Sequence, residues 1–148
     1  MIGIVLIGHS HIASEMLKSL EFVVGEQVLM DALDVSHDSG PEALTDQLKA
    51  KIRGCDIGQG VLLLADMFGG TPCNIAMGCL QQGHTEVVSG FNLPLLIKAA
   101  TLRHELNNLP ELASQVVLAG RQYIQVAPQI STACHMHDSD IAVKHADA

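Results

Sequence analysis

The sequence predicts an α/β domain of three layers, in which a mostly parallel, open sheet of the flavodoxin-like type carries helices on both faces. Four short runs rich in Val, Ile and Leu are typical of strands that are buried on both sides. Patterns of apolar residues at helical spacing lie between these runs and after the last one. Prolines stand where most of these helices should begin, and glycines stand where several should end.

The strands are expected where the apolar runs occur in the chain. The four runs are Ile2–Ile7, Gln27–Val35, Gly60–Ala65 and Thr85–Ser89. A helical segment separates each run from the next, so we expect the strands to be parallel and the crossovers to be right-handed.

The helices are expected from apolar residues that recur every three or four positions. The predicted helices cover approximately residues 13–24, 41–53, 72–82, 93–104 and 110–119. Gly25, Gly54 and Gly83 stand at or near the predicted ends of the first three helices. Together, the predicted strands and helices give the order βαβαβαβαα.

Length and composition predict one acidic domain with an aliphatic core. The chain has 148 residues, of which 48% are hydrophobic but only 3% are aromatic. Its formal net charge of -8 disfavours nucleic-acid binding, because phosphate backbones are also negative. The same charge suits a basic protein partner, or it serves solubility alone.

The sequence also predicts a cytoplasmic protein that does not insert into a membrane. The N-terminus lacks the basic region of a signal peptide, and no apolar run reaches the roughly 18 residues of a membrane span. Cys55, Cys73, Cys79 and Cys134 form no C-x-x-C pair and no zinc spacing, so we expect reduced thiols.

A change in composition divides the chain into a domain, residues 1–128, and a polar tail, residues 129–148. The tail is expected either to be disordered or to contact a partner subunit. A metal site there remains an alternative to a solvated tail, and its candidate ligands are Cys134, His135, His137, Asp138 and His145. In the domain itself we expect no metal and no cofactor.

Polar and small residues follow the strands at the edge where open parallel sheets place their sites. These residues are His9, Ser10 and His11 after the first strand, Asp34, Ser36, His37 and Asp38 at the end of the second, Asp66, Met67, Phe68, Gly69, Gly70 and Thr71 after the third, and Asn92 after the fourth.

Within this set, His9 and Asp66 suit phosphoryl chemistry. A neutral imidazole nitrogen attacks phosphorus, while a carboxylate holds the proton on the other nitrogen and stabilises the cation that forms. The turn Gly69–Thr71 leads into a helix, and free N–H groups at a helix start bind phosphate oxygens. Each residue alone could be an ordinary loop residue, but their placement at one sheet edge favours the phosphoryl interpretation.

Three blocks of sequence carry recognisable motifs. In residues 2–13 a strand runs directly into His9, and the small Ala13 follows four residues later. Residues 61–72 contain an Asp-x-x-Gly-Gly-Thr-Pro turn, and residues 86–96 contain a Gly-x-Asn-x-Pro turn. Together the blocks resemble the mannose-type enzyme IIA domains of the bacterial sugar phosphotransferase system, over roughly residues 1–125.

The resemblance implies that His9 is phosphorylated on Nε2 and that Asp66 holds the proton on Nδ1. The residues that it implies for phosphate binding are Ser10, Gly69, Gly70 and Thr71, and the candidates for partner contact are His11, Met67, Phe68 and Asn92. Many family members have Gly where this chain has Ser10, and His11 is a second possible nucleophile. The position of Ala13 favours His9.

The resemblance also implies partners and an assembly. The donor would be the phosphocarrier protein HPr, and the acceptor would be an enzyme IIB domain or another protein of the same system. Family members have an extra edge strand beside four parallel strands, and homodimers are usual. Sugar uptake and regulation both fit a standalone domain of this kind.

Three alternatives remain open at this point. The first is the phosphocarrier subunit of dihydroxyacetone kinase, which uses the same chemistry. The second is a binding module without catalysis. The third is a metal-dependent hydrolase that uses His9, His11 and Asp66.

Overall fold

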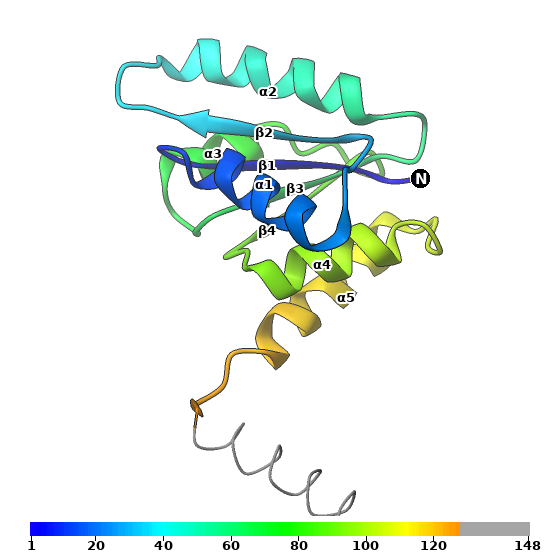
Figure 1. Ribbon diagram of the computed structural model, residues 1–148. Helices are drawn as coiled ribbons and strands as arrows, with labels where there is room; N and C mark the ends of the chain where they lie inside the picture. The colour runs from blue at the N-terminus through cyan, green and yellow to red at the C-terminus, as the bar shows by residue number, and fades with distance from the viewer. Residues whose placement is uncertain (128–148) are drawn as a thin grey trace, which may run out of the picture.

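The computed structural model describes residues 1–127, which form alternating strands and helices followed by a final helix pair (Figure 1). The strands are β1 (Gly3–His9), β2 (Met30–Val35), β3 (Val61–Ala65) and β4 (Thr85–Ser89). The helices are α1 (Ile12–Val24), α2 (Pro41–Cys55), α3 (Thr71–Gly78), α4 (Leu93–Leu102) and α5 (Leu109–Gln122).

The four strands form one parallel sheet in the order β2-β1-β3-β4. The chain steps from β1 to one side for β2 and then returns to the other side of β1 for β3. The strand order therefore reverses between β1 and β3, as in flavodoxin-like sheets. This confirms the predicted fold class and places a switch point between these two strands.

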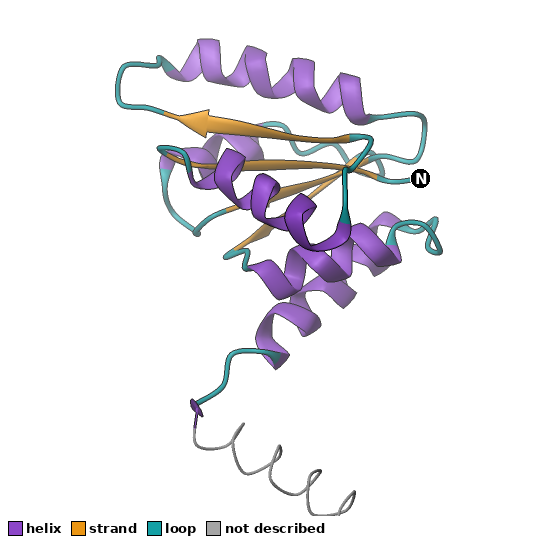
Figure 2. Cartoon of the chain, viewed as in Figure 1, coloured by secondary structure: helices purple, strands orange, loops and turns teal. Residues whose placement is uncertain are grey.

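Helices cover both faces of the sheet, giving the three predicted layers (Figure 2). Helices α2 and α3 pack on one face, and α1, α4 and α5 pack on the other. Alternate residues of β1 supply the two cores: Val5 and Ile7 pack toward α2 and α3, whereas Ile4 and Leu6 pack toward the other helices. This alternation explains why the strands are apolar throughout.

Several predicted boundaries were wrong. Strand β2 begins at Met30 rather than at Gln27, because residues 28 and 29 form a turn in which Leu29 has a positive φ of 52°. Helix α3 ends at Gly78 rather than at Gln82. There the Thr85 hydroxyl group accepts the Gln81 N–H at 2.6 Å and donates to the Cys79 carbonyl oxygen, which fixes a loop.

The expectations for the helix-ending glycines, the extra edge strand and the tail have different outcomes. Gly25 does follow the last residue of α1, whereas Gly54 lies inside α2, which continues to the buried Cys55. Within residues 1–127 the sheet has four strands and no further edge strand. The tail 129–148, with Cys134 and its neighbouring histidines, lies outside the described residues. None of the helices described here is both long and apolar enough to cross a membrane.

Arg103 is an unexpected member of the interior. Its side chain follows α4 and is 1% exposed. The guanidinium group donates to the carbonyl oxygens of Val28 at 2.6 Å and Leu29 at 3.1 Å, and to Oε1 of Gln27 at 3.1 Å. Burial lowers the pKa of Arg103. The residue thus ties the end of α4 to the turn before β2, where the predicted strand was too long.

Arg103 supplies our first prediction. Arg103→Met keeps the length and most of the volume of the side chain, but it leaves partly buried oxygens without donors. We expect the free energy of unfolding to fall by at least about 2 kcal/mol, measured by urea denaturation. Arg121→Met in the exposed last turn of α5 is the control and should change it by less than about 0.5 kcal/mol. Equal urea midpoints of unfolding for the two variants would contradict the role of Arg103 in holding the turn before β2.

Candidate functional site

The candidate site lies at the carboxyl ends of β1 and β3, on either side of the switch point. His9 is the last residue of β1, and Asp66 directly follows β3. The parallel pairing of Ile7 with Ala65 brings the two residues side by side, and the Asp66 N–H donates to the Ile7 carbonyl oxygen at 3.2 Å. Sheet pairing therefore joins residues that are 57 positions apart.

The Asp66 carboxylate binds both the backbone N–H group and the ring of His9. Oδ2 accepts the His9 backbone N–H at 2.9 Å and lies 2.7 Å from Nδ1 of the imidazole. Oδ1 accepts the Met67 N–H at 2.8 Å. A carboxylate can only accept, so the proton of a neutral His9 ring lies on Nδ1 and the free electron pair lies on Nε2.

Burial and hydrogen bonding shift the pKa of Asp66 in opposite directions. Its side chain is only 9% exposed, and burial alone would raise the pKa of the carboxyl group. The hydrogen bonds from the His9 N–H, the His9 ring and the Met67 N–H outweigh burial and hold the pKa below its ordinary value. Asp66 is therefore ionised at neutral pH, as an orienting group for a cationic ring must be.

Gly70 makes room for the ring of His9. A Cβ atom at this position would lie 2.7 Å from Cε1 and 3.1 Å from Nε2 of His9, which is too close for a side chain. The ring therefore lies against the backbone of Gly70, which is the N-cap of α3. With the imidazole 48% exposed, Nε2 is next to the start of a helix and within reach of solvent or a partner.

The start of α3 is suited to an anion. No side chain caps this helix, Pro72 lacks an N–H group, and Thr71 is its exposed first residue. Backbone N–H groups there carry partial positive charge. Gly69 adopts a φ of 86°, which glycine tolerates best. The structure thus places Gly70 against the His9 ring, with Gly69 and Thr71 beside it in the chain.

Ser10 has a strained backbone. Its φ is 52°, a left-handed conformation that costs a residue with a side chain about 1–2 kcal/mol. The Ser10 N–H donates to the Val35 carbonyl oxygen at 2.8 Å and so is already used inside the domain. Only its exposed hydroxyl group is left for the predicted role in phosphate binding.

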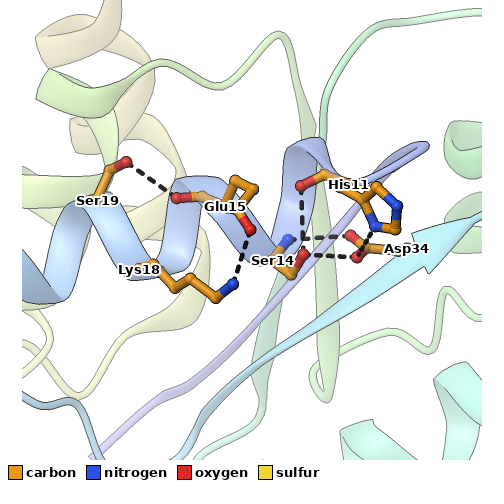
Figure 3. Close-up of polar contacts among 6 residues, drawn as sticks. All are labelled: His11, Ser14, Glu15, Lys18, Ser19 and Asp34. Atoms are coloured by element: carbon orange, nitrogen blue, oxygen red, sulfur yellow. Dashed lines mark hydrogen bonds and ion pairs between the residues drawn. The ribbon is translucent and has the colours of Figure 1, made fainter.

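His11 belongs to a second histidine–carboxylate pair, which the sequence did not reveal. Asp34, at the end of β2, has Oδ2 3.3 Å from Nδ1 of His11 and accepts hydrogen bonds from Ser14 (Figure 3). The sequence placed Asp34 at the correct sheet edge but assigned it no partner. The parallel register, which sets Asp34 beside Gly8, was the signal that could have linked it to the turn after β1.

The predicted partner-contact residues differ in their surroundings. Met67 and Phe68 are 54% and 79% exposed, on the turn that follows Asp66. Asn92 instead caps α4, accepting the Leu95 N–H at 3.0 Å, and donates to the Gly120 carbonyl oxygen at 2.9 Å. Its amide group is thus used within the domain, whereas the side chains of Met67 and Phe68 are free for contact.

Charge and metal-ligand chemistry at this edge are limited. The segments 8–12, 34–40, 66–71 and 90–92 contain no Lys or Arg. In the part of the chain that the structure describes, no three His, Cys, Asp or Glu residues lie close enough together to hold a metal ion. The hydrolase alternative therefore lacks a ligand set among residues 1–127.

Comparison with known proteins gives a consistent picture. The chain is 31% identical over 125 residues to the mannose-specific EIIAB component of Escherichia coli K12, covering 84% of this chain but only 39% of that protein. It is 26% identical to the fructose-specific EIIA component of Bacillus subtilis, covering 87% and 88% of the two chains.

Solved structures give the same picture. The mannose/sorbose-specific IIA subunit from Enterococcus faecalis superimposes with a TM-score of 0.75 at 29% identity, covering 84% of this chain and 93% of that one. An EIIA component from Streptococcus agalactiae has a TM-score of 0.80 at 23% identity, which shows the shared fold. The family model EIIA-man, described as the PTS system fructose IIA component, matches residues 3–117. The chain therefore belongs to this mannose-type enzyme IIA family of the sugar phosphotransferase system.

Proposed function

We propose that the protein is a histidine phosphocarrier that accepts a phosphoryl group from phospho-HPr on Nε2 of His9 and passes it to an acceptor of the IIB type. The observation that carries the proposal is the 2.7 Å contact between Nδ1 of His9 and the ionised Asp66, with the ring against the uncapped start of α3. Family membership agrees with this role.

The transfer needs only groups that this arrangement supplies. In the first step Nε2 of His9 attacks phosphorus, and the bond between phosphorus and the donor's histidine nitrogen breaks. The proton on Nδ1 stays in place, so the phosphorylated ring becomes a cation beside Asp66. The N–H groups at the start of α3 and of the turn at Gly69 would bind the phosphoryl oxygens. The second step reverses this order toward the acceptor.

The family match favours the sugar system over the dihydroxyacetone kinase alternative. Because the donor and acceptor would be cytoplasmic proteins of that system, we propose that this protein also works in the cytoplasm. Sugar uptake and regulation use the same step at His9, so the site supports both. The binding-module alternative differs in one respect, since it predicts no phosphate on His9.

The first functional prediction concerns His9. With phosphoenolpyruvate, enzyme I and HPr, the wild type should gain one acid-labile phosphate, and His9→Ala should gain none, because among residues 1–127 the His9 ring alone lies against the start of α3 with Nδ1 2.7 Å from a carboxylate. Intact mass and peptide mapping measure both. His84→Ala, which removes an exposed histidine in the loop before β4, is the matched control and should label fully.

Two outcomes would contradict the assignment. Full labelling of folded His9→Ala would transfer the role to another residue, with His11 examined next. An unlabelled wild type beside a competent control carrier would favour the binding module.

Asp66→Asn tests the orienting role. The amide NH2 group can donate toward Nδ1 and so favours the tautomer with its proton on Nε2, which cannot attack. We expect phosphoryl transfer to slow by about 100-fold or more, with little change in the affinity for HPr. Because the pKa of Asp66 is held low, the carboxylate stays ionised from about pH 6 to pH 8. The ratio of the wild-type rate to the Asp66→Asn rate should therefore stay constant over this range. Rapid-quench labelling measures both rates. A wild-type rate in Asp66→Asn would remove Asp66 from the mechanism.

We also propose a homodimer. Strand β4 lies at an edge of the described sheet and contacts α5, and the exposed apolar side chains on α5 and just after it are Leu118, Tyr123, Ile124 and Val126. An apolar cluster beside an open strand edge is typical of an interface. Sedimentation equilibrium should give about twice the chain mass of 15.7 kDa.

Ile124→Glu should shift the equilibrium between monomer and dimer toward the monomer, because the substitution places a charge in the proposed interface. Phe22→Glu, on the exposed side of α1, is the control and should leave the mass unchanged. A monomeric wild type would refute the dimer.

A further inference from the structure

Asp34 binds the first turn of α1 from the neighbouring strand β2. Its Oδ1 accepts the Ser14 backbone N–H at 3.0 Å, and its Oδ2 accepts the Ser14 hydroxyl group at 2.5 Å (Figure 3). Oδ2 also lies 3.3 Å from Nδ1 of His11. One carboxylate therefore joins the end of β2 to two residues at the start of this helix.

This contact replaces the usual cap of α1. His11 occupies the N-cap position, and its side chain makes no capping hydrogen bond. Ser14 is the third residue of the helix, whose N–H group an N-cap side chain would normally bind. Asp34 accepts that N–H group instead, and its negative charge also suits the positive end of the helix. The position of the helix start thus depends on β2.

The helix start in turn determines the position of His9. Ser10 alone separates His9 from the N-cap residue His11, and Ser10 is held at a φ of 52°. The left-handed conformation of a serine costs energy and persists only where the surrounding contacts hold the turn. Asp66 fixes the His9 end through the backbone N–H and the ring. The contacts of Asp34 fix the other end.

We infer that Asp34 is a positioning residue for phosphoryl transfer at His9, acting through the first turn of α1 and the strained Ser10. This inference rests on the proposed function for its kinetic consequence. Asp34 forms its hydrogen bonds with His11 and Ser14 rather than with His9, and it does not take part in the chemistry. Without it the turn relaxes, and Nε2 of His9 moves away from the start of α3, where the phosphoryl group would be bound.

The experiment compares four proteins: the wild type, Asp34→Ala, Ser14→Ala and Asp31→Ala. Ser14→Ala removes the 2.5 Å hydroxyl contact but keeps the backbone bond, and alanine is a good helix former. Asp31→Ala is the matched control, because it removes another β2 carboxylate and its 2.8 Å contact with Lys51, away from the turn. Circular dichroism gives the folded fraction of each protein.

Two readouts separate positioning from general stability. The first is the kcat and KM for labelling by phospho-HPr, expressed per folded molecule. We expect kcat to fall about tenfold in Asp34→Ala and about threefold in Ser14→Ala, with KM unchanged within about twofold. The second is the nitrogen-15 NMR spectrum of the His9 ring, in which the fixed Nδ1–H tautomer of the wild type should give way to exchange in Asp34→Ala. Asp31→Ala should match the wild type in both.

The outcomes are distinguishable. Wild-type kcat in folded Asp34→Ala and Ser14→Ala overturns the inference, as does an unchanged His9 ring spectrum. If Asp34→Ala does not fold, Ser14→Ala decides alone by the same criteria. A wild type that takes no phosphate refutes the proposed function, and the ring spectrum then still tests whether Asp34 positions His9.

Discussion

The bond between His9 and Asp66 depends on the one place in the sheet where the strand order reverses. At that point the chain leaves β1 and β3 in opposite directions, toward α1 and α3, so no crossover covers the edge between them. The histidine from one strand and the carboxylate from the next therefore meet in a position that is open on the solvent side. The buried aliphatic strands behind them fix the backbone from which both side chains project.

Small residues at the same edge allow this approach. The backbone of Gly70 lies where a side chain would collide with the imidazole, and a Cβ at Gly8 would come within 3.3 Å of Oδ2 of Asp66. The site is thus built from close backbone contacts as much as from polar side chains. The turn after β1 is the exception, because Ser10 adopts a conformation that glycine would accept more readily. Contacts on both sides, from Asp66 and Asp34, accompany that strain.

The sequence was informative where one physical rule governs a segment. Strands buried on both faces must be apolar, so β1 and β3 were located closely, and parallel pairing then placed His9 near Asp66. It was less informative where a distant side chain decides the local structure. Arg103 binds the carbonyl oxygens of the turn before β2, Thr85 fixes the loop after α3, and Asp34 caps α1. None of these contacts leaves a periodic signal, because each joins residues that only the finished fold brings together.

The absence of Lys and Arg from the four segments at this edge bears on how firmly a phosphoryl group could be held. On Nε2 of His9 the group would meet the partial charges of backbone amides and the neutral hydroxyl groups of Ser10 and Thr71, in a chain whose formal net charge is -8. A fixed cation would lower the free energy of the phosphorylated state and make the group harder to release. Without one in these segments, the phosphorus–nitrogen bond would keep a high transfer potential, and the equilibrium with the proposed donor and acceptor would stay close to balanced. The direction of flow would then follow from the concentrations of the phosphorylated proteins on either side rather than from this domain.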